Sequence, residues 1–200
     1  PSTASPVTVY VVVGADGVNS TTRSKYESHF NPRIDVRKCR FIWLGTKKKL
    51  NAFTFGFKET QWGWFNLHAY QFTEEWATFI VETPEETWLR AGIDKMEPDQ
   101  SIAFCEKVFA EDLQGAKLMT NARHLRGSAW LNFQRVVCEQ WWLKNARGAH
   151  VVLMGDAVHT AHFAIGSGTK LAIEDAIELA RLFEQHGDDA THIPEVLAQY

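Results

Sequence analysis

The stretch Val151–Ala180, VVLMGDAVHTAHFAIGSGTKLAIEDAIELA, decides how the rest of this 200-residue sequence is interpreted. The run His150–Met154 predicts a buried strand, and Gly155-Asp156 follows it directly. Gly166-Ser167-Gly168 then precedes a segment, residues 169–185, in which apolar side chains recur at helical spacing. The stretch therefore predicts a strand, a glycine-containing loop and a long helix, which is a building unit of α/β sheets.

Two features of this stretch point to a ligand. In open α/β sheets, ligands bind beyond the carboxyl ends of the strands, so we expect the Asp156 carboxylate to accept hydrogen bonds from ligand hydroxyls. Gly166 and Gly168 leave the amino terminus of the expected helix free of side chains. Its N–H groups and positive dipole end favour an electron-rich group. Together these features predict a cradle for a flavin nucleotide.

A similar unit begins the sequence. Val7–Val13 (VTVYVVV) is rich in β-branched residues and predicts a buried strand that stops at Gly14. The turn Gly14-Ala15-Asp16-Gly17 follows, and Asn19–Arg23 can cap and open a short helix. A turn of this composition is common, so it is not by itself evidence of a binding site.

The middle of the chain has a different pattern. From Lys38 to Val81, aromatic and aliphatic side chains alternate with polar ones, which is typical of antiparallel strands with short turns. Thr83–Glu86 predicts a capped helix that stops at Gly92. A second helix is expected over Ser101–Leu113, and a strand pair around Ala129–Trp142.

Composition excludes several functions. The 45% hydrophobic and 22% charged residues are typical of a globular protein, and a net charge of -3 gives no reason to expect nucleic acid or an anionic membrane as partner. No apolar run is long enough to span a bilayer. Three widely spaced cysteines fit neither a disulfide framework nor a zinc site, so we expect a reducing, cytoplasmic setting and no metal.

The strings Gly14–Ser20 (GADGVNS) and Gly155–His159 (GDAVH), continuing to Ala172–Ala176 (AIEDA), resemble the two later fingerprints of the FAD-dependent aromatic hydroxylases, the group A flavoprotein monooxygenases. Their order and surrounding strands match as well. The resemblance implies an α/β (α+β) fold. Residues 1–30 and 146–200 would be parts of a Rossmann-like FAD-binding domain, and residues 31–145 an inserted antiparallel-sheet domain that binds substrate.

The resemblance also implies a set of cofactor-binding residues. Asp156 would hold the ribityl chain or the neighbouring phosphate region, and the backbone at Gly166 and Gly168 would approach the flavin ring near N1. Asp16 would belong to the motif that supports FAD and transient pyridine-nucleotide binding, with Arg23 as its structural partner. The full expected set is Asp16, Gly17, Arg23, Gly155, Asp156, Gly166, Ser167, Gly168 and Thr169.

The family's chemistry implies that NAD(P)H reduces FAD and that O2 then forms a flavin C4a-hydroperoxide, which hydroxylates a small aromatic substrate. Within the family, Thr160–Ala172 and Trp130–Phe133 are more similar to the branch that acts on aryl-coenzyme A thioesters, including salicylyl-CoA 5-hydroxylase and 2-aminobenzoyl-CoA monooxygenase. Phe163 and Lys170 depart from the proline and asparagine usual in the family. His162 either orients substrate, as a catalytic residue, or simply packs.

Two alternatives remain open. The family's first fingerprint, Gly-x-Gly-x-x-Gly, is absent from these 200 residues, so we expect a fragment whose amino-terminal part is missing. The chain could also be a non-catalytic flavoprotein-like remnant or part of a related FAD-dependent reductase.

Other residues have simpler interpretations. Lys47–Lys49 is a solvated hairpin tip or a holder of coenzyme A phosphates. His159 and His162 are loop residues rather than metal ligands, and Glu174-Asp175 are first-turn acids of the long helix.

Overall fold

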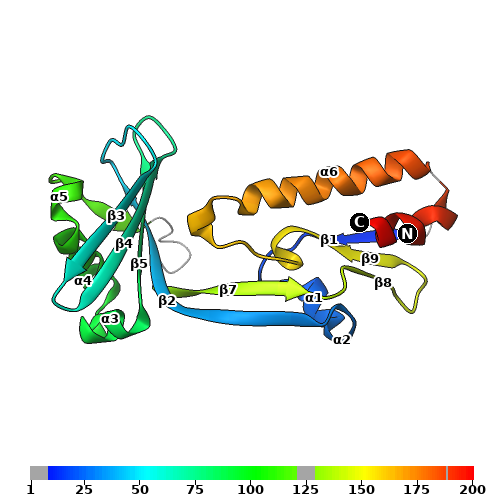
Figure 1. The fold of residues 1–200 in the computed structure, drawn as a ribbon, viewed down its shortest axis with the longest axis horizontal. Coiled ribbons are helices and arrows are strands. Elements are labelled where there is room, and N and C mark those ends of the chain that lie inside the picture. Colours follow the sequence, from blue (N-terminus) through cyan, green and yellow to red (C-terminus); the bar gives the residue numbers. More distant parts are fainter. Residues whose placement is uncertain (1–8, 121–128, 188) are drawn as a thin grey trace, which may run out of the picture. The chain divides into compact units, whose positions relative to one another are not determined.

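The computed structural model describes residues 9–120, 129–187 and 189–200 (Figure 1). The chain forms two compact units: unit 1 comprises residues 1–35 and 134–200, and unit 2 comprises residues 36–133. Both boundaries fall inside long strands that pair with each other, β2 (Pro32–Thr46) and β7 (Leu131–Cys138). The functional domain limits expected from the sequence, after residues 30 and 145, stay a prediction.

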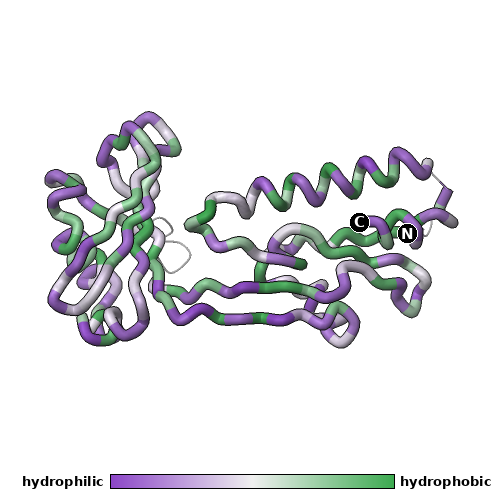
Figure 2. The backbone as a smooth tube through the Cα atoms, viewed as in Figure 1, coloured by the Kyte–Doolittle hydropathy of each residue, from purple (hydrophilic) through white to green (hydrophobic). Residues whose placement is uncertain are grey.

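Unit 1 contains a small sheet, one long helix and several short helices. Its elements are β1 (Val11–Gly14), α1 (Thr21–Lys25), α2 (Glu27–Phe30), β8 (Trp142–Lys144), β9 (His150–Leu153), η3 (Gly155–Ala157), η4 (Phe163–Ile165), α6 (Gly168–His186), η5 (Ala190–His192) and α7 (Ile193–Gln199). The predicted long helix over residues 169–185 is confirmed. Hydrophilic and hydrophobic residues alternate along α6, as an amphipathic helix requires (Figure 2).

The sheet of unit 1 has the strand order β1-β9-β8. β1 and β9 are parallel, with Val11 opposite His150 and Gly14 opposite Leu153. Because parallel strands end at the same edge, the turns that follow Gly14 and Leu153 begin side by side. This register brings the two sequence fingerprints together, although more than a hundred residues separate them.

The two strands differ in burial. All four residues of β9 are buried, as predicted. The expectation of a buried strand over Val7–Val13 is wrong for β1: Val12 and Val13 are 40% and 46% exposed, and Val7 lies outside the described residues. The physical reason is that β1 pairs with β9 on one edge and has no second partner strand within the described part of the chain.

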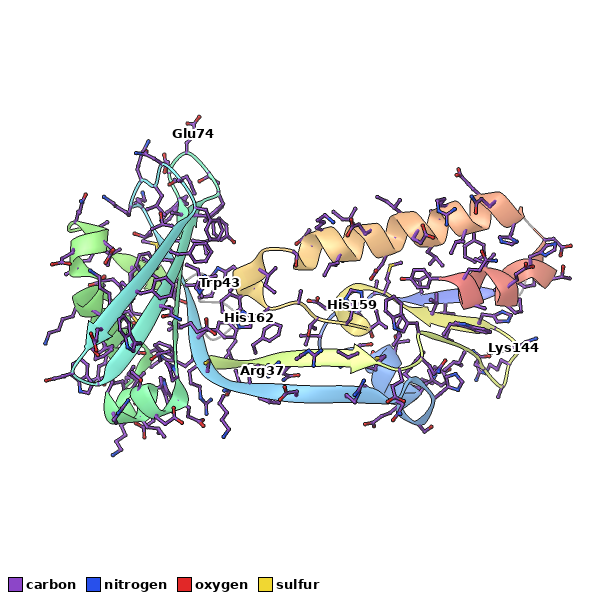
Figure 3. All side chains as sticks on the ribbon, in the orientation of Figure 1. Arg37, Trp43, Glu74, Lys144, His159 and His162 are labelled. Atoms are coloured by element: carbon purple, nitrogen blue, oxygen red, sulfur yellow. The ribbon has the colours of Figure 1, made fainter. Side chains whose placement is uncertain are left out.

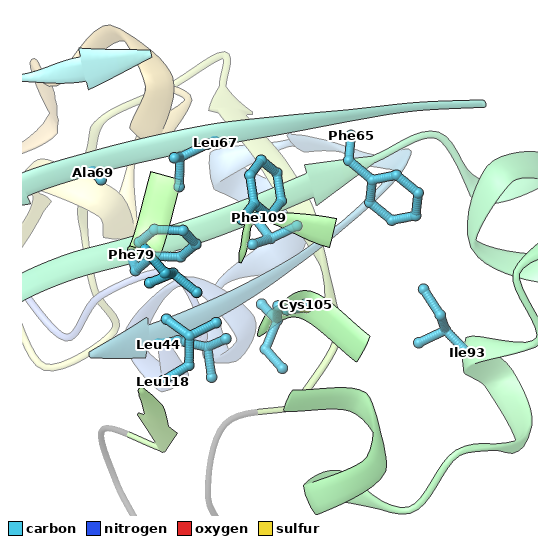
Figure 4. Packing of buried hydrophobic residues seen from close by; sticks show 12 residues of the cluster. Leu44, Phe65, Leu67, Ala69, Phe79, Ile93, Cys105, Phe109 and Leu118 are labelled. Atoms are coloured by element: carbon cyan, nitrogen blue, oxygen red, sulfur yellow. The ribbon is translucent and has the colours of Figure 1, made fainter. Parts of the chain in front are cut away.

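Unit 2 is built on an antiparallel sheet, as the alternating pattern predicted. Its elements are β3 (Thr54–Thr60), β4 (Gly63–Gln71), β5 (Ala77–Thr83), α3 (Glu85–Arg90), η1 (Ile93–Lys95), α4 (Pro98–Val108), α5 (Ala110–Leu113) and β6 (Leu118–Thr120). The sheet order is β3-β4-β5-β2-β6, and β7 also pairs with β2. α4 and α5 cover one face and form a core in which Phe79 meets Phe109 edge to face (Figure 4).

The opposite face of this sheet carries exposed aromatic side chains. Phe55 and Phe57 of β3, and Phe53 just before it, are all at least half exposed, and Phe53 stacks on Tyr70 of β4. Along β5, Phe79 and Val81 belong to the core, so Ile80, which lies between them, points to the aromatic face.

Three local expectations for unit 2 and its neighbours need correction. Thr83 does not cap a helix, because it ends β5 and its hydroxyl donates to the Trp64 carbonyl. The helix expected over Ser101–Leu113 begins earlier, at Pro98, and breaks at Phe109 into α4 and α5. The strands near Ala129–Trp142 exist as β7 and β8, but β7 pairs with β2 and β8 with β9.

Candidate functional site: a glycine-lined cavity at the ends of β1 and β9

The candidate site begins where β9 ends. Gly155 has a φ of +58°, which turns the chain sharply, and its N–H donates to Oδ2 of Asp175 on α6 at 2.8 Å. A Cβ atom on Gly155 would lie 3.1 Å from the Cβ of Ala172. A glycine is therefore needed both for the turn and for the close approach of α6.

Asp156 follows in η3 and is exposed. Its carboxylate makes no hydrogen bond within the described part of the chain. It is thus available to accept hydrogen bonds from a ligand, as the sequence predicted for this position.

A cavity of about 350 Å³ joins this turn to the turn after β1 and to the start of α6. Its lining consists of Ala15, Gly17, Met154, Gly155, Asp156, Gly168, Thr169 and Ala172. Five of the nine residues expected to bind the cofactor are therefore brought together. Sequence reasoning missed Ala15, Met154 and Ala172 as lining residues. Of these, only Ala172 offered a signal in the sequence, because its small side chain lets the helix come close to Gly155.

The cavity fits part of a dinucleotide cofactor. At Gly17, with a φ of +76°, and at Gly168, an added Cβ would meet no protein atom within 4 Å. The space beside both glycines is therefore open, so that a chain or ring edge of a ligand can come close to the protein backbone. The amino terminus of α6, a helix of 19 residues with no acidic side chain in its first turn, adds a positive dipole end.

Gly166 and Ser167 precede this helix but do not line the cavity. Gly166 ends η4 with a φ of +68°, and Ser167 is the N-cap of α6 without a side-chain capping bond. Their expected contact with the flavin ring stays a prediction.

Asp16 has the opposite environment to Asp156. Its carboxylate accepts hydrogen bonds from the hydroxyls of Ser20, Thr21 and Thr22, and from the backbone N–H of Thr22 at 3.0 Å. Loss of solvent alone would raise the pKa of Asp16, but the Ser20 and Thr22 hydrogen bonds hold that pKa well below its ordinary value. Asp16 therefore organises the turn before α1, and a direct cofactor contact stays a prediction.

Arg23 connects the two fingerprints. The side chain is buried, and its guanidinium donates to the carbonyl of Val18 at 2.6 Å and to that of Ala157 at 2.8 Å. Arg23 does not line the cavity. It holds the turn after β1 against the turn after β9, and its expected part in cofactor binding stays a prediction.

His159 and His162 lie on the segment between β9 and α6 (Figure 3). Nε2 of His159 lies 3.0 Å from Oδ2 of Asp175, so Asp175 links the histidine, the Gly155 turn and α6. The expectation that Asp175 is a first-turn acid is wrong, because α6 begins at Gly168 and its first turn holds no acid. Glu174 pairs instead with Lys170.

Nδ1 of His162 accepts from the Ala164 N–H at 3.3 Å, and its ring lies 4.3 Å from that of Phe163. His162 thus caps η4. Its expected role toward a substrate stays a prediction.

A second cavity of about 350 Å³ lies within unit 2. It is lined by Trp43, Leu44, Gly45, Phe72, Trp76, Thr78, Met119 and Thr120. The Lys47 ammonium lies 4.9 Å from the centre of the Trp76 ring, and Nζ of Lys48 donates to Gln114. The cavity therefore combines aromatic walls with the Lys47 cation at its margin.

A fold of two parallel strands with glycine turns over a helix terminus defines a class of nucleotide-binding proteins. A family model described as an FAD binding domain matches residues 3–191. The chain belongs to this family, and FAD is the cofactor that the family implies.

Two curated relatives are similar over most of this chain. Salicyloyl-CoA 5-hydroxylase of a Streptomyces species is 37% identical over 193 residues, covering 95% of this chain and 36% of the relative. A 3-hydroxy-4-methyl-anthranilyl-[aryl-carrier protein] 5-monooxygenase of Streptosporangium sibiricum is 36% identical over 170 residues, covering 85% and 42%. The chain thus spans less than half the length of these two relatives.

Among solved structures, a probable FAD-dependent monooxygenase from Pseudomonas aeruginosa matches with a TM-score of 0.66 and 21% identity, covering 95% of this chain and 50% of that one. This likeness supports the fold.

Within the residues that the structure describes, no helix combines the length and apolar composition needed to cross a membrane.

Proposed function

We propose that the whole protein is an FAD-dependent monooxygenase that hydroxylates an aromatic substrate with NAD(P)H and O2. The observation that carries this proposal is the cavity in which Gly17, Asp156 and Gly168, from three separate elements, meet at one sheet edge. Family membership and the names of the relatives support the reaction class.

The residues of this chain have three tasks in that reaction. Asp156 accepts hydrogen bonds from cofactor hydroxyls, and Gly17 and Gly168 let the backbone come close to the cofactor. The amino terminus of α6 stabilises negative charge on the electron-rich part of the bound group. When bound, FAD supplies the electron transfer and oxygen activation that amino-acid side chains do not provide.

The overall reaction balances as follows: an aromatic C–H compound, O2, NAD(P)H and one proton give the phenol, NAD(P)+ and water. One oxygen atom enters the new C–O bond, and the other leaves as water. NAD(P)H is oxidised by two electrons, and the aromatic carbon loses its hydrogen.

The substrate class we infer is an aromatic acid carried as a thioester on coenzyme A or on a carrier protein. The names of both relatives contain such a substrate. The aromatic-walled cavity at Trp43, Phe72 and Trp76 offers surface for a flat ring, and Lys47 at its margin is suited to an anionic carrier group.

The test uses the intact protein, purified with FAD, and measures O2 consumption, NAD(P)H oxidation and phenol formation with a panel of aryl-CoA thioesters. We expect NAD(P)H oxidation and O2 uptake to rise with a matching thioester and one oxygen atom of the product to derive from O2. A related reductase would consume NAD(P)H and form a reduced product without this incorporation. Absence of any bound flavin would contradict the proposal at its first step.

A further inference from the structure

Three side chains with metal-ligating atoms, His186, His192 and Glu195, lie together at the carboxyl end of α6. None of them lines the cofactor cavity. Nδ1 of His192 lies 3.6 Å from Oε2 of Glu195, and Nδ1 of His186 lies 3.9 Å from the same oxygen. One ligand atom from each of the three side chains lies within 4.8 Å of the other two.

The local structure explains why these side chains converge. His186 is the last residue of α6, and His192 is the N-cap of α7. Glu195 is three positions after His192, so both project from the same face of the first turn of α7. Zinc bonds of about 2.0–2.2 Å place tetrahedral ligand atoms about 3.4 Å apart. The two histidine–glutamate distances, 3.6 Å and 3.9 Å, therefore need to shorten by only a few tenths of an ångström around an ion. The longest separation in the cluster is at most 4.8 Å, so rotation of these partly exposed side chains has to shorten it by no more than about 1.4 Å.

The electrostatic setting favours a cation. Residues 185–200 contain three acids, Asp188, Asp189 and Glu195, and no lysine or arginine. The negative end of the α6 dipole points at His186, which attracts positive charge.

We propose that His186, His192 and Glu195 form a binding site for a divalent transition metal, zinc being the ion that best suits the donors. Two imidazole nitrogens and one carboxylate oxygen suit zinc better than magnesium or calcium, which prefer all-oxygen ligands. Water completes the fourth position, since the cluster is partly exposed. The ion joins α6 to α7, whose Val196 and Leu197 are buried in unit 1.

Zinc titration of the intact protein tests this site. The protein is stripped of metal with a chelator and titrated with Zn²⁺ against a chromophoric competitor, and Co²⁺ is then added to observe the visible bands of tetrahedral cobalt. The variant Glu195→Gln removes one ligand at a 60% exposed side chain, so the fold should tolerate it. Glu184→Gln is the matched control, because it makes the same change on exposed α6 surface outside the cluster.

We expect the wild-type protein and Glu184→Gln to bind Zn²⁺ equally, and Glu195→Gln to bind it at least about 10-fold more weakly. Zn²⁺ should raise the Tm of the first two proteins and not that of Glu195→Gln. His192→Ala provides a second, independent loss of one ligand. Equal zinc affinity in all four proteins would overturn the site and leave only surface His–Glu ion pairs.

Discussion

At the scale of single residues, two aspartates that look alike in the sequence behave differently. Each follows a strand and adjoins a glycine, but Asp16 receives four hydrogen bonds while Asp156 remains exposed beside a cavity. The sequence predicted a ligand-facing role for both. It could not separate them, because whether a carboxylate is satisfied locally depends on the three-dimensional path of the following turn.

The low pKa of Asp16 gives a pH-dependent prediction. Because its folded-state pKa lies below the ordinary value of 3.8, its contribution to stability is full above that pH and is lost as the pH falls further. We expect Asp16→Asn to lower the free energy of unfolding by about 1 kcal/mol at neutral pH. Urea unfolding at a series of pH values should show that the difference in free energy of unfolding between the wild type and Asp16→Asn shrinks as the pH falls below 3.8. A difference that did not change with pH would contradict the low pKa of Asp16.

At the scale of elements, the Arg23 side chain connects the turns after β1 and β9 through its hydrogen bonds to Val18 and Ala157. Replacing it with methionine removes one buried and one partly buried hydrogen bond and leaves the Ala157 and Val18 carbonyls without this donor. We expect Arg23→Met to lower the free energy of unfolding by about 3 kcal/mol.

The matched control for Arg23 is Arg33→Met. The Arg33 side chain is 75% exposed and lies 3.9 Å from Glu139, so its loss should cost about 0.5 kcal/mol or less. Denaturant unfolding measures both variants. Similar costs for the two would show that the buried guanidinium does not hold the turns together.

The turn between β3 and β4 provides a second comparison. Gly63 has a φ of +127°, and a Cβ there would lie 2.3 Å from Oγ1 of Thr87, whereas Gly92, with a φ of +68°, has open space. We expect Gly92→Ala to cost about 1 kcal/mol through backbone strain alone, and Gly63→Ala to cost at least about 2 kcal/mol. Thermal and urea unfolding give both values. An equal cost would mean that Thr87 moves aside freely.

Elements with strong periodicity were predictable, and their pairings were not. The long run of helical spacing gave α6 almost to its ends, and alternation gave the sheet of unit 2. The helix breaks at Phe109, whose ring packs edge to face on Phe79, and a contact between segments so distant in sequence has no local sequence signal. The pairing of β7 with β2, rather than with β8, is likewise set by the tertiary fold.

At the scale of the whole molecule, the resemblance of two short strings predicted which distant segments meet. The parallel register of β1 and β9 confirms that meeting. The link from Asp175 to Gly155 and His159 was beyond sequence reasoning, because all three residues have plausible local roles. Only the placement of α6 over the turn shows that one carboxylate serves both.

The central claim is that the cavity at the ends of β1 and β9 holds FAD through Asp156. Its most direct test is the FAD dissociation constant of the intact protein, compared between Asp156→Ala and Glu174→Ala, which removes an exposed acid of α6 outside the cavity. Hydrogen bonds to a charged group are worth about 1.5–3 kcal/mol, so Asp156→Ala should bind FAD about 10- to 100-fold more weakly. Glu174→Ala should match the wild type. An unchanged dissociation constant in Asp156→Ala would contradict the account.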